Sequence, residues 1–270
     1  MRKIIKLNPY YEKKIWGYEK WYLSTYNEKN SKVSYNNEEL ERYIGKKLNI
    51  LIKIIKADEN LSVQVHPNDE YARKYENESG KAECWYVIEA KKNSSIICGI
   101  KSGLDRYKVK KSIEENKLED NFLRIPIKKS DIINIPAGTV HSLSGGIKVL
   151  EIQQNSDITY RLYDYNRGRK LDIEKALDVL NYDNLNSGQF YGDELQTEYF
   201  TLKRIIINNK IALDIEVDTA IFIIRGELVI TSLGEKELLS QNDMIYILES
   251  NRYILEGNGE LILVVANSIG

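Results

Sequence analysis

The sequence contains little histidine, cysteine and proline: two histidines, two cysteines and four prolines among 270 residues. Cys84 and Cys98 form no CxxC pair, which argues against a disulfide scaffold. No apolar run approaches the length of a membrane span, and the first residues lack the apolar segment of a signal peptide. We therefore expect a cytoplasmic protein without a membrane partner.

The sequence also lacks an excess of charge of one sign. Its 39 basic and 40 acidic residues leave a net charge of -1, so no global field would attract nucleic acid, and no nucleic-acid partner is expected. Hydrophobic residues make up 42% and charged residues 29%, as is typical of a compact globular protein. The length allows one large domain or two smaller ones, each with a stable core.

Short apolar or alternating segments separated by polar turns fill residues 48–165 and resume after Phe200, which predicts a mainly β fold of the sandwich or barrel type. Two interruptions are predicted to be helical. Residues 105–123 are charged and lack strand alternation, and residues 171–182 have apolar side chains at i, i+3, i+4 and i+7. The turn-rich stretch 181–194 predicts a boundary between a first domain over 1–185 and a smaller one over 195–270.

One histidine lies in the strand-like segment SVQVHPNDE. Because side chains alternate along a strand, Ser62, Gln64 and His66 are predicted to share one face. Val63 and Val65 then point into the opposite layer. This segment would form one polar wall of a site.

A second polar wall is predicted in GKAECWY, where the same period brings Lys81, Glu83 and Trp85 together. His141 begins another strand after the turn PAG. A glutamine oxygen, two imidazoles and a carboxylate would suit a catalytic divalent ion such as Zn²⁺. The alternative is that each histidine is a hydrogen-bonded structural residue, and the absence of histidine elsewhere in the chain favours the metal site.

Two further strands carry charge in informative positions. Lys53 lies inside the apolar segment ILIKIIKA, so its ammonium needs a pocket or an anion, unless the side chain snorkels from a strand end. In NSDITYRLYDY, alternation puts Asp157, Thr159, Arg161 and Tyr163 on one face. An acid and a guanidinium could then enter one cavity, and the alternative is a surface cross-strand ion pair.

Several motifs follow one another along the chain: NPYYEKKIWG, QVHP, KAE, IPAGTVH and EIQQNSDITYRLYDY. In this order they resemble type I mannose-6-phosphate isomerase, a metal-dependent enzyme of the cupin superfamily, in its short bacterial form. The resemblance spans most of the chain and weakens after about residue 200. It implies two cupin-like β-barrel or jelly-roll units with a small helical insertion, and the interconversion of mannose 6-phosphate and fructose 6-phosphate.

The resemblance also implies a role for individual residues. It implies that one divalent ion, taken as Zn²⁺, is held by Gln64, His66, Glu83 and His141. It implies that Arg161 is the catalytic arginine, with Lys81 as a second catalytic residue, and that the substrate pocket contains Trp16, Lys53, Ser62 and Asp157. Ser62 and Lys53 are the candidates for the phosphate end. The general base is left open between a metal-bound water, Lys81 and another pocket group.

Two positions depart from the family pattern. Tyr18 stands where a second glycine often follows Ile-Trp-Gly, and Arg167 stands where the family has a lysine beyond the catalytic arginine. The second unit contains no histidine and is expected to hold no metal. The alternatives are another metal-dependent cupin enzyme, such as an oxygenase or an epimerase, and a non-catalytic sugar-phosphate binding module. The chain is expected to be a monomer whose partner is a sugar phosphate.

Overall fold

The computed structural model describes residues 2–115, 117–183 and 188–267, which form two compact units. Unit 1 comprises Met1–Tyr11, Lys20–Ile52 and Gly192–Gly270, and unit 2 comprises Glu12–Glu19 and Lys53–Tyr191. The predicted linear division into 1–185 and 195–270 differs from these units, which combine segments distant in the sequence. The reason is long-range strand pairing, since β1 (Ile4–Asn8) pairs antiparallel with β19 (Met244–Ile247). Residues 184–187 of the predicted boundary lie outside the described residues.

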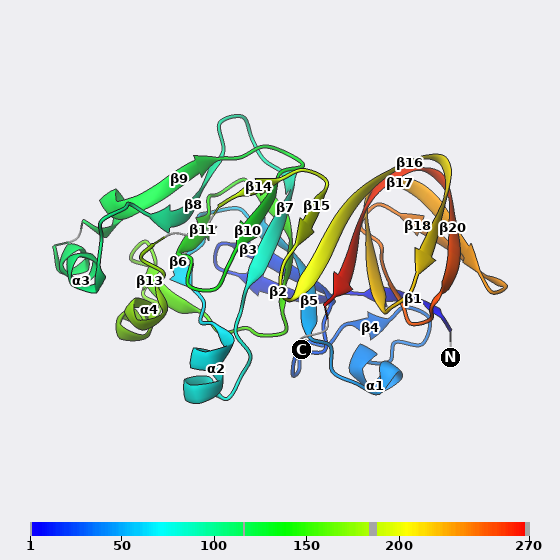
Figure 1. Ribbon diagram of the computed structural model, residues 1–270, viewed down its shortest axis with the longest axis horizontal. Coiled ribbons are helices and arrows are strands. Elements are labelled where there is room, and N and C mark those ends of the chain that lie inside the picture. Colours follow the sequence, from blue (N-terminus) through cyan, green and yellow to red (C-terminus); the bar gives the residue numbers. More distant parts are fainter. Residues whose placement is uncertain (1, 116, 184–187, 268–270) are drawn as a thin grey trace. The chain divides into compact units, whose positions relative to one another are not determined.

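Unit 1 is built on an eight-stranded antiparallel sheet (Figure 1). Besides β1 and β19, its strands are β4 (Lys32–Val33), β15 (Glu194–Gln196), β16 (Phe200–Ile215), β17 (Thr219–Ser232), β18 (Glu235–Ser240) and β20 (Asn251–Ala266). They follow the order β15-β16-β20-β17-β19-β1-β4, with β18 paired to β17. Helix α1 (Leu40–Ile44) also belongs to this unit. Isoleucine and leucine side chains at alternate strand positions fill its core.

Unit 2 contains most of a seven-stranded sheet and a complete five-stranded sheet. The seven-stranded sheet consists of β14 (Phe190–Tyr191), β10 (Ile132–Ile135), β7 (Glu83–Glu89), β12 (Lys148–Gln154), β5 (Ile50–Ala57), β3 (Gly17–Leu23) and β2 (Tyr10–Lys14), in that order. The five-stranded sheet consists of β13 (Tyr160–Tyr163), β6 (Val63–Val65), β11 (His141–Leu143), β8 (Ser95–Ile100) and β9 (Phe122–Pro126). Side chains from both sheets form one hydrophobic cluster. Because strands arranged in sheets contain far more residues than the helices, the prediction of a mainly β, cupin-like fold is confirmed.

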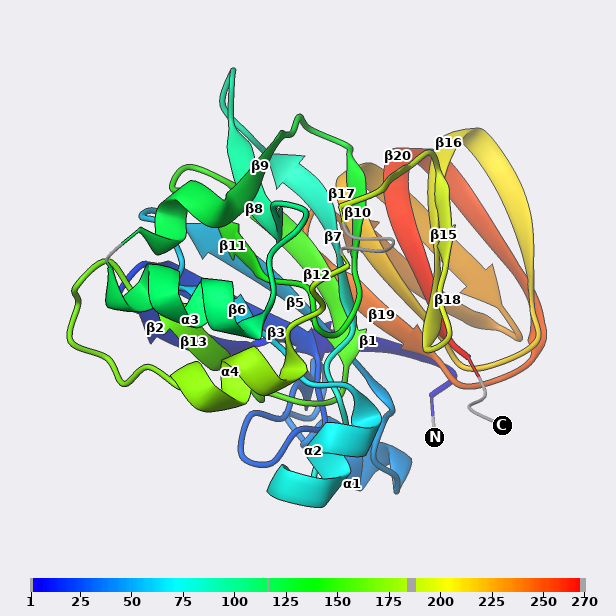
Figure 2. The same cartoon turned by 60° about the vertical axis from the view of Figure 1, so that its left-hand side comes forward.

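Both segments of unit 2 that were predicted to be helical contain a helix, and residue 116 of the first segment lies outside the described residues. Residues 105–123 contain α3 (Arg106–Glu114) and the 3-10 helix η1 (Leu118–Asn121), and residues 171–182 contain α4 (Ile173–Val179). The prediction is wrong at the end of the first segment, because Phe122 starts β9 and is buried in the core. Figure 2 shows α3 and α4 side by side, and the ion pair between Arg106 and Glu174 joins them at 2.7 Å.

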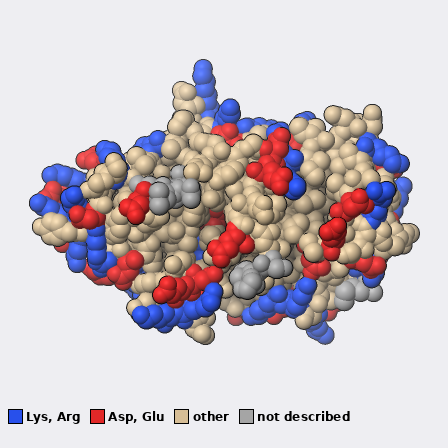
Figure 3. All heavy atoms as spheres, viewed as in Figure 1, with Lys and Arg blue, Asp and Glu red and all other residues tan. Residues whose placement is uncertain are grey.

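Helix α2 (Asp69–Glu76) was not predicted, although a capping signal marks its start. The Asn68 side chain accepts a hydrogen bond from Tyr71 N at 3.0 Å. None of the helices in the described ranges has the length and hydrophobicity that a membrane span requires. On the face shown in Figure 3, basic and acidic side chains are interspersed, which fits the balanced composition.

Candidate metal centre and substrate cavity

Three side chains from the two sheets of unit 2 meet in its interior. His66 follows β6, Glu83 begins β7 and His141 begins β11. Each has only 1% of its surface exposed, and their ligand atoms all lie within 4.8 Å of one another. In the β6–β11 pair, His141 stands opposite Gln64, which brings the fourth predicted ligand alongside. The structure thus brings together all four residues of the predicted metal site.

The turn before β11 fixes where His141 begins its strand. Thr139 N donates to Pro136 O at 3.1 Å, and Gly138 has φ +84°. A Cβ at Gly138 would lie 2.9 Å from Val179 O, so only glycine fits this turn. Gly138 N also donates to His66 O at 2.8 Å, which ties the turn to the other histidine.

The two imidazoles are oriented for coordination. Nδ1 of His66 lies 2.7 Å from Ile158 O, and Nδ1 of His141 lies 2.9 Å from Thr139 O. Each Nδ1 therefore carries the proton and donates it, which leaves the Nε2 lone pair directed into the cluster. Burial lowers the pKa of both histidines, so the rings are neutral, as a metal ligand must be.

Glu83 and Gln64 supply the oxygen atoms of the cluster. Glu83 Oε1 is buried, accepts no hydrogen bond from the described residues and lies 3.2 Å from His141 Nε2. The amide of Gln64 lies 3.4 Å from the same nitrogen, and turning it by half a rotation would present its oxygen. A buried carboxylate oxygen without a donor, next to two neutral imidazoles, fits a divalent cation such as Zn²⁺. The donor set therefore fits the metal that the family resemblance implies.

A network of hydrogen bonds holds the strand that carries Glu83. Gln154 Oε1 accepts from Ala82 N at 2.9 Å, and Gln154 Nε2 donates to Asp69 Oδ1 at 3.1 Å. Asp69 Oδ1 also accepts from Gly80 N at 2.7 Å. Gln154 thus fixes the backbone on both sides of Lys81.

Buried charges continue from the cluster into the unit. Lys81 Nζ lies 3.0 Å from His66 Nε2 and contacts the Glu83 carboxylate. Lys53 Nζ pairs with Glu151 at 3.1 Å and with Glu19 at 3.3 Å. Burial would lower the pKa of Lys53, but the two carboxylates outweigh it and raise the pKa. The alternative that Lys53 snorkels to solvent is wrong, since its side chain is 4% exposed.

These charges border a cavity of about 170 Å³ that opens beside the cluster. The predicted residues that line it are Trp16, Lys53, Ser62, Gln64, Lys81, Asp157, Thr159 and Arg161. Arg161 Nε is buried and has no hydrogen-bond partner among the described residues. Tyr163 does not line the cavity, because the β6–β13 register shifts between Arg161 and Tyr163 and ends the alternation.

The cavity is also lined by four charged residues that the sequence did not single out: Lys14, Glu19, Glu151 and Arg169. Glu151 lies in the apolar segment IKVLEIQQ, so the reasoning applied to Lys53 would have found it. Lys53 and Lys81 hold the pKa of Glu151 low against the opposing effect of its burial. Arg169 lies in the loop segment NRGRK, and no sequence feature distinguishes it from the two other basic residues of that segment.

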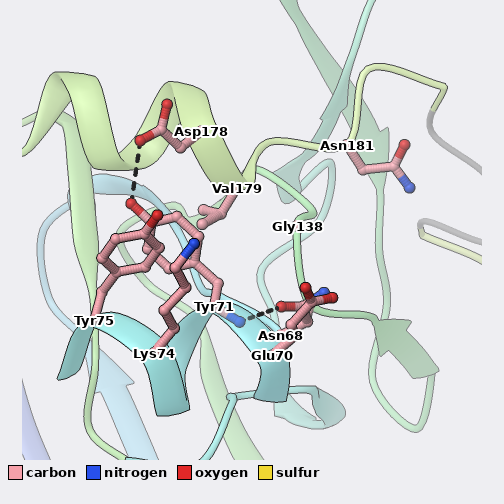
Figure 4. Close-up of a pocket in the computed structure, with 10 residues that line it drawn as sticks. Asn68, Glu70, Tyr71, Lys74, Tyr75, Gly138, Asp178, Val179 and Asn181 are labelled. Atoms are coloured by element: carbon pink, nitrogen blue, oxygen red, sulfur yellow. Dashed lines mark hydrogen bonds between the residues drawn. The ribbon is translucent and has the colours of Figure 1, made fainter. Parts of the chain in front are cut away.

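A larger cavity of about 430 Å³ lies elsewhere in unit 2, between α2, α4 and the turn at Gly138 (Figure 4). Its lining includes Tyr71 and Tyr75, whose rings are 4.4 Å apart, and Asp178, which accepts a hydrogen bond from Tyr71. None of the predicted site residues lines this cavity. Its lining is more exposed than the ligand cluster, so the smaller cavity is the candidate site.

Comparison with known proteins bears on the family resemblance. Residues 19–92 match the model of the type I phosphomannose isomerase catalytic domain. The chain is 44% identical over 143 residues to mannose-6-phosphate isomerase ManA of Bacillus subtilis, which covers 50% of this chain and 45% of that protein. It is 43% identical over 137 residues to mannose-6-phosphate isomerase of Streptococcus mutans, which covers 48% and 43%. Over these stretches the chain is similar to the type I phosphomannose isomerases. The resemblance predicted from its motifs is confirmed.

The likeness extends further in structure than in sequence. The chain spans less than half the length of these curated relatives in the alignments. The crystal structure of the mannose 6-phosphate isomerase from Bacillus subtilis nevertheless covers 98% of this chain and 100% of that one, with a TM-score of 0.90 and 27% identity. A structure of mannose 6-phosphate isomerase bound with zinc and yttrium shares the fold, with a TM-score of 0.75 and 13% identity.

Proposed function

We propose that this chain is a mannose-6-phosphate isomerase that interconverts mannose 6-phosphate and fructose 6-phosphate with one bound divalent ion, Zn²⁺. The observation that carries the proposal is the buried cluster of His66, Glu83 and His141 beside a charged cavity. We assign these residues and Gln64 as the metal ligands. The relatives named above support the activity and the substrate, since both are mannose-6-phosphate isomerases by name and align with about half of this chain.

The isomerisation moves a hydrogen between C1 and C2 of the open-chain sugar, and negative charge develops on the oxygens of the enediol. When bound, the ion supplies a Lewis acid for this charge. Arg161 can donate its unpaired Nε–H to the same oxygens, in a site where few donors compete. Lys81 and Glu151 line the cavity 3.7 Å apart and can exchange a proton with the substrate.

The remaining predicted residues bind the sugar. Trp16 and Ser62 are buried at the cavity wall, and Asp157 lies with them. The indole offers an apolar face to a sugar ring, while the hydroxyl and the carboxylate can bond its hydroxyl groups. We expect a monomer that acts in the cytoplasm, where sugar phosphates are formed and where two unpaired buried cysteines persist.

The test is a coupled assay of fructose 6-phosphate formation from mannose 6-phosphate. Turnover by the purified protein should disappear on chelation and return when Zn²⁺ is restored. A folded, metal-loaded protein that binds the sugar phosphate without turnover would instead identify a binding module. Oxygen uptake by the metal-loaded protein would identify a different cupin chemistry.

A further inference from the structure

The substrate cavity carries more basic than acidic side chains. Five basic residues line it: Lys14, Lys53, Lys81, Arg161 and Arg169. Three acidic residues line it: Glu19, Glu151 and Asp157. A phosphate monoester carries a charge of about -1.5 to -2 at pH 7, so its binding requires donors that are not already committed to carboxylates.

The three lysines already form ion pairs with carboxylates. Their partners within 3.4 Å are Glu151 and Glu19 for Lys53, Glu83 for Lys81, and Glu12 and Glu19 for Lys14. Lys53 was expected at the phosphate end, but binding phosphate there would separate a buried ammonium from two buried carboxylates. That separation is costly, because unpaired buried charges are poorly solvated. The lysines are therefore poor phosphate anchors.

The two arginines enter the cavity at different places. Arg161 stands opposite Gln64 in the β6–β13 pair, which puts it beside the ligand cluster. Arg169 comes from the loop after β13, outside the ligand strands. Its Nε donates to Asp164 Oδ2 at 2.8 Å and its Nη2 donates to Asp164 Oδ1. Among the described residues Nη1 has no hydrogen-bond partner, so it can bind a ligand. Asp164 is 3% exposed, so the guanidinium is held by a fixed fork.

Arg167 is the other arginine of this loop and the position where the family pattern has a lysine. It lines a different cavity, together with Asp58, Glu59 and other residues. Its Nη2 donates to Asn60 O at 2.8 Å and its Nε to Asp164 O at 3.2 Å. Arg167 therefore contacts Asp164 as Arg169 does but does not reach the substrate cavity.

We propose that Arg169 binds the phosphate group of the substrate, an inference that rests on the proposed function and assigns the phosphate end of its site. Asp164 is a positioning residue, because it orients the guanidinium without reaching the cavity itself. The Arg169 side chain is 27% exposed, whereas His66, Glu83 and His141 are each 1% exposed. Phosphate bound at Nη1 would therefore lie at the solvent side of the cavity, with the sugar carbons directed toward the ligand cluster. The exocyclic phosphate and the reacting C1 and C2 would then occupy opposite ends.

Steady-state kinetics of Arg169→Ala test this assignment. KM for mannose 6-phosphate should rise about 10-fold to 100-fold while kcat changes less than about threefold, since a charge-assisted hydrogen bond to a non-reacting group is lost. Arg169→Lys should restore part of the affinity. Arg167→Ala is the matched control, since it also loses a contact with Asp164, and it should leave KM unchanged. A fall in kcat at constant KM in Arg169→Ala would overturn the assignment.

A binding measurement separates this inference from the proposed function. Calorimetric titration of the metal-loaded protein with inorganic phosphate requires no turnover, and Arg169→Ala should weaken phosphate binding about as much as it raises KM. Equal phosphate binding by Arg169→Ala and the parent protein would overturn the role of Arg169, even if the protein is an isomerase. Lost phosphate binding would support it, even if another reaction is catalysed. Circular dichroism and thermal unfolding would identify a variant that fails to fold.

Discussion

The two mainly β units differ in what they bury. The core of unit 1 is a continuous cluster of aliphatic side chains with Tyr253, formed by β16, β17, β19, β20 and their neighbours. Unit 2 has comparable hydrophobic clusters, but it also buries two histidines, two lysines and three glutamates in or beside one cavity. This difference indicates that the interior of a β unit can hold several charged side chains when they pair with one another or bind a ligand.

Unit 1 contains a buried carboxylate whose charge is compensated by arginines. Glu260 is 2% exposed and its two oxygens pair with Arg204 at 2.6 Å and Arg225 at 2.8 Å. Glu83 of unit 2 has an oxygen with no such donor among the described residues. Glu260 is thus a structural carboxylate with both oxygens paired, whereas Glu83 has an oxygen that can bind a metal.

The strongest test of this contrast is the exchange of each glutamate for glutamine. Glu83→Gln should lower the proposed isomerase activity by about 10³-fold or more and abolish stoichiometric metal binding, because it neutralises the one anionic side chain among the four proposed ligands. Metal content by atomic absorption and the coupled assay measure both effects. The Glu260→Gln protein should have a lower free energy of unfolding but an unchanged metal content. Full metal content in Glu83→Gln would disprove the ligand assignment.

A second test compares the hydrophobic cores. Ile221→Ala in unit 1 should lower the free energy of unfolding by about 2–5 kcal/mol, because it leaves a cavity among well-packed neighbours. Metal affinity at 25 °C should stay unchanged. The matched variant Ile133→Ala in β10, whose residue stands opposite Trp85 in β7, should lose similar stability and also bind metal more weakly. Urea unfolding and chelator competition would show whether the two cores separate in this way.

The local sequence predicted much of this contrast. Alternation put Gln64 and His66 on one face, and the structure places both beside the cluster while Val63 and Val65 are buried in the hydrophobic core. The pattern of residues 171–182 predicted a helix, and α4 forms there because its apolar side packs on that core. Such periodic signals are local, so a single sequence contains them.

What the sequence did not predict depends on contacts between distant segments. The pairing of β1 with β19 joins residues about 240 positions apart, and no local pattern specifies it. The bulge that removes Tyr163 from the cavity is likewise a property of strand pairing. The role of Arg169 follows from its fork with Asp164, since a loop sequence with several cations does not indicate which one enters a cavity.

A third and smaller effect is expected where unit 2 positions its ligands through neutral hydrogen bonds. Gln154→Met removes the bonds to Ala82 N and Asp69 and should weaken metal binding about 10-fold to 100-fold, because the strand before Glu83 loses its anchor. Asp69→Asn keeps an acceptor oxygen and should retain most of the affinity. Isothermal titration with Zn²⁺ measures both variants, and equal affinity in Gln154→Met would show that packing alone positions Glu83.

The smallest effect should come from the charge pair at the edge of the cavity. Burial would raise the pKa of Asp164, but Arg169 and Arg167 outweigh it and hold the pKa below its ordinary value. A depressed carboxyl pKa contributes stability that is fully present above the unfolded-state pKa of about 3.9 and is lost as the pH falls through the folded-state value. Asp164→Asn should therefore cost about 1–2 kcal/mol at pH 7, and the gap to the parent protein should narrow below about pH 4. Urea unfolding at pH 7, 5 and 3 measures this gap, and a gap that stays constant with pH would mean that packing, rather than charge, holds Arg169 in place.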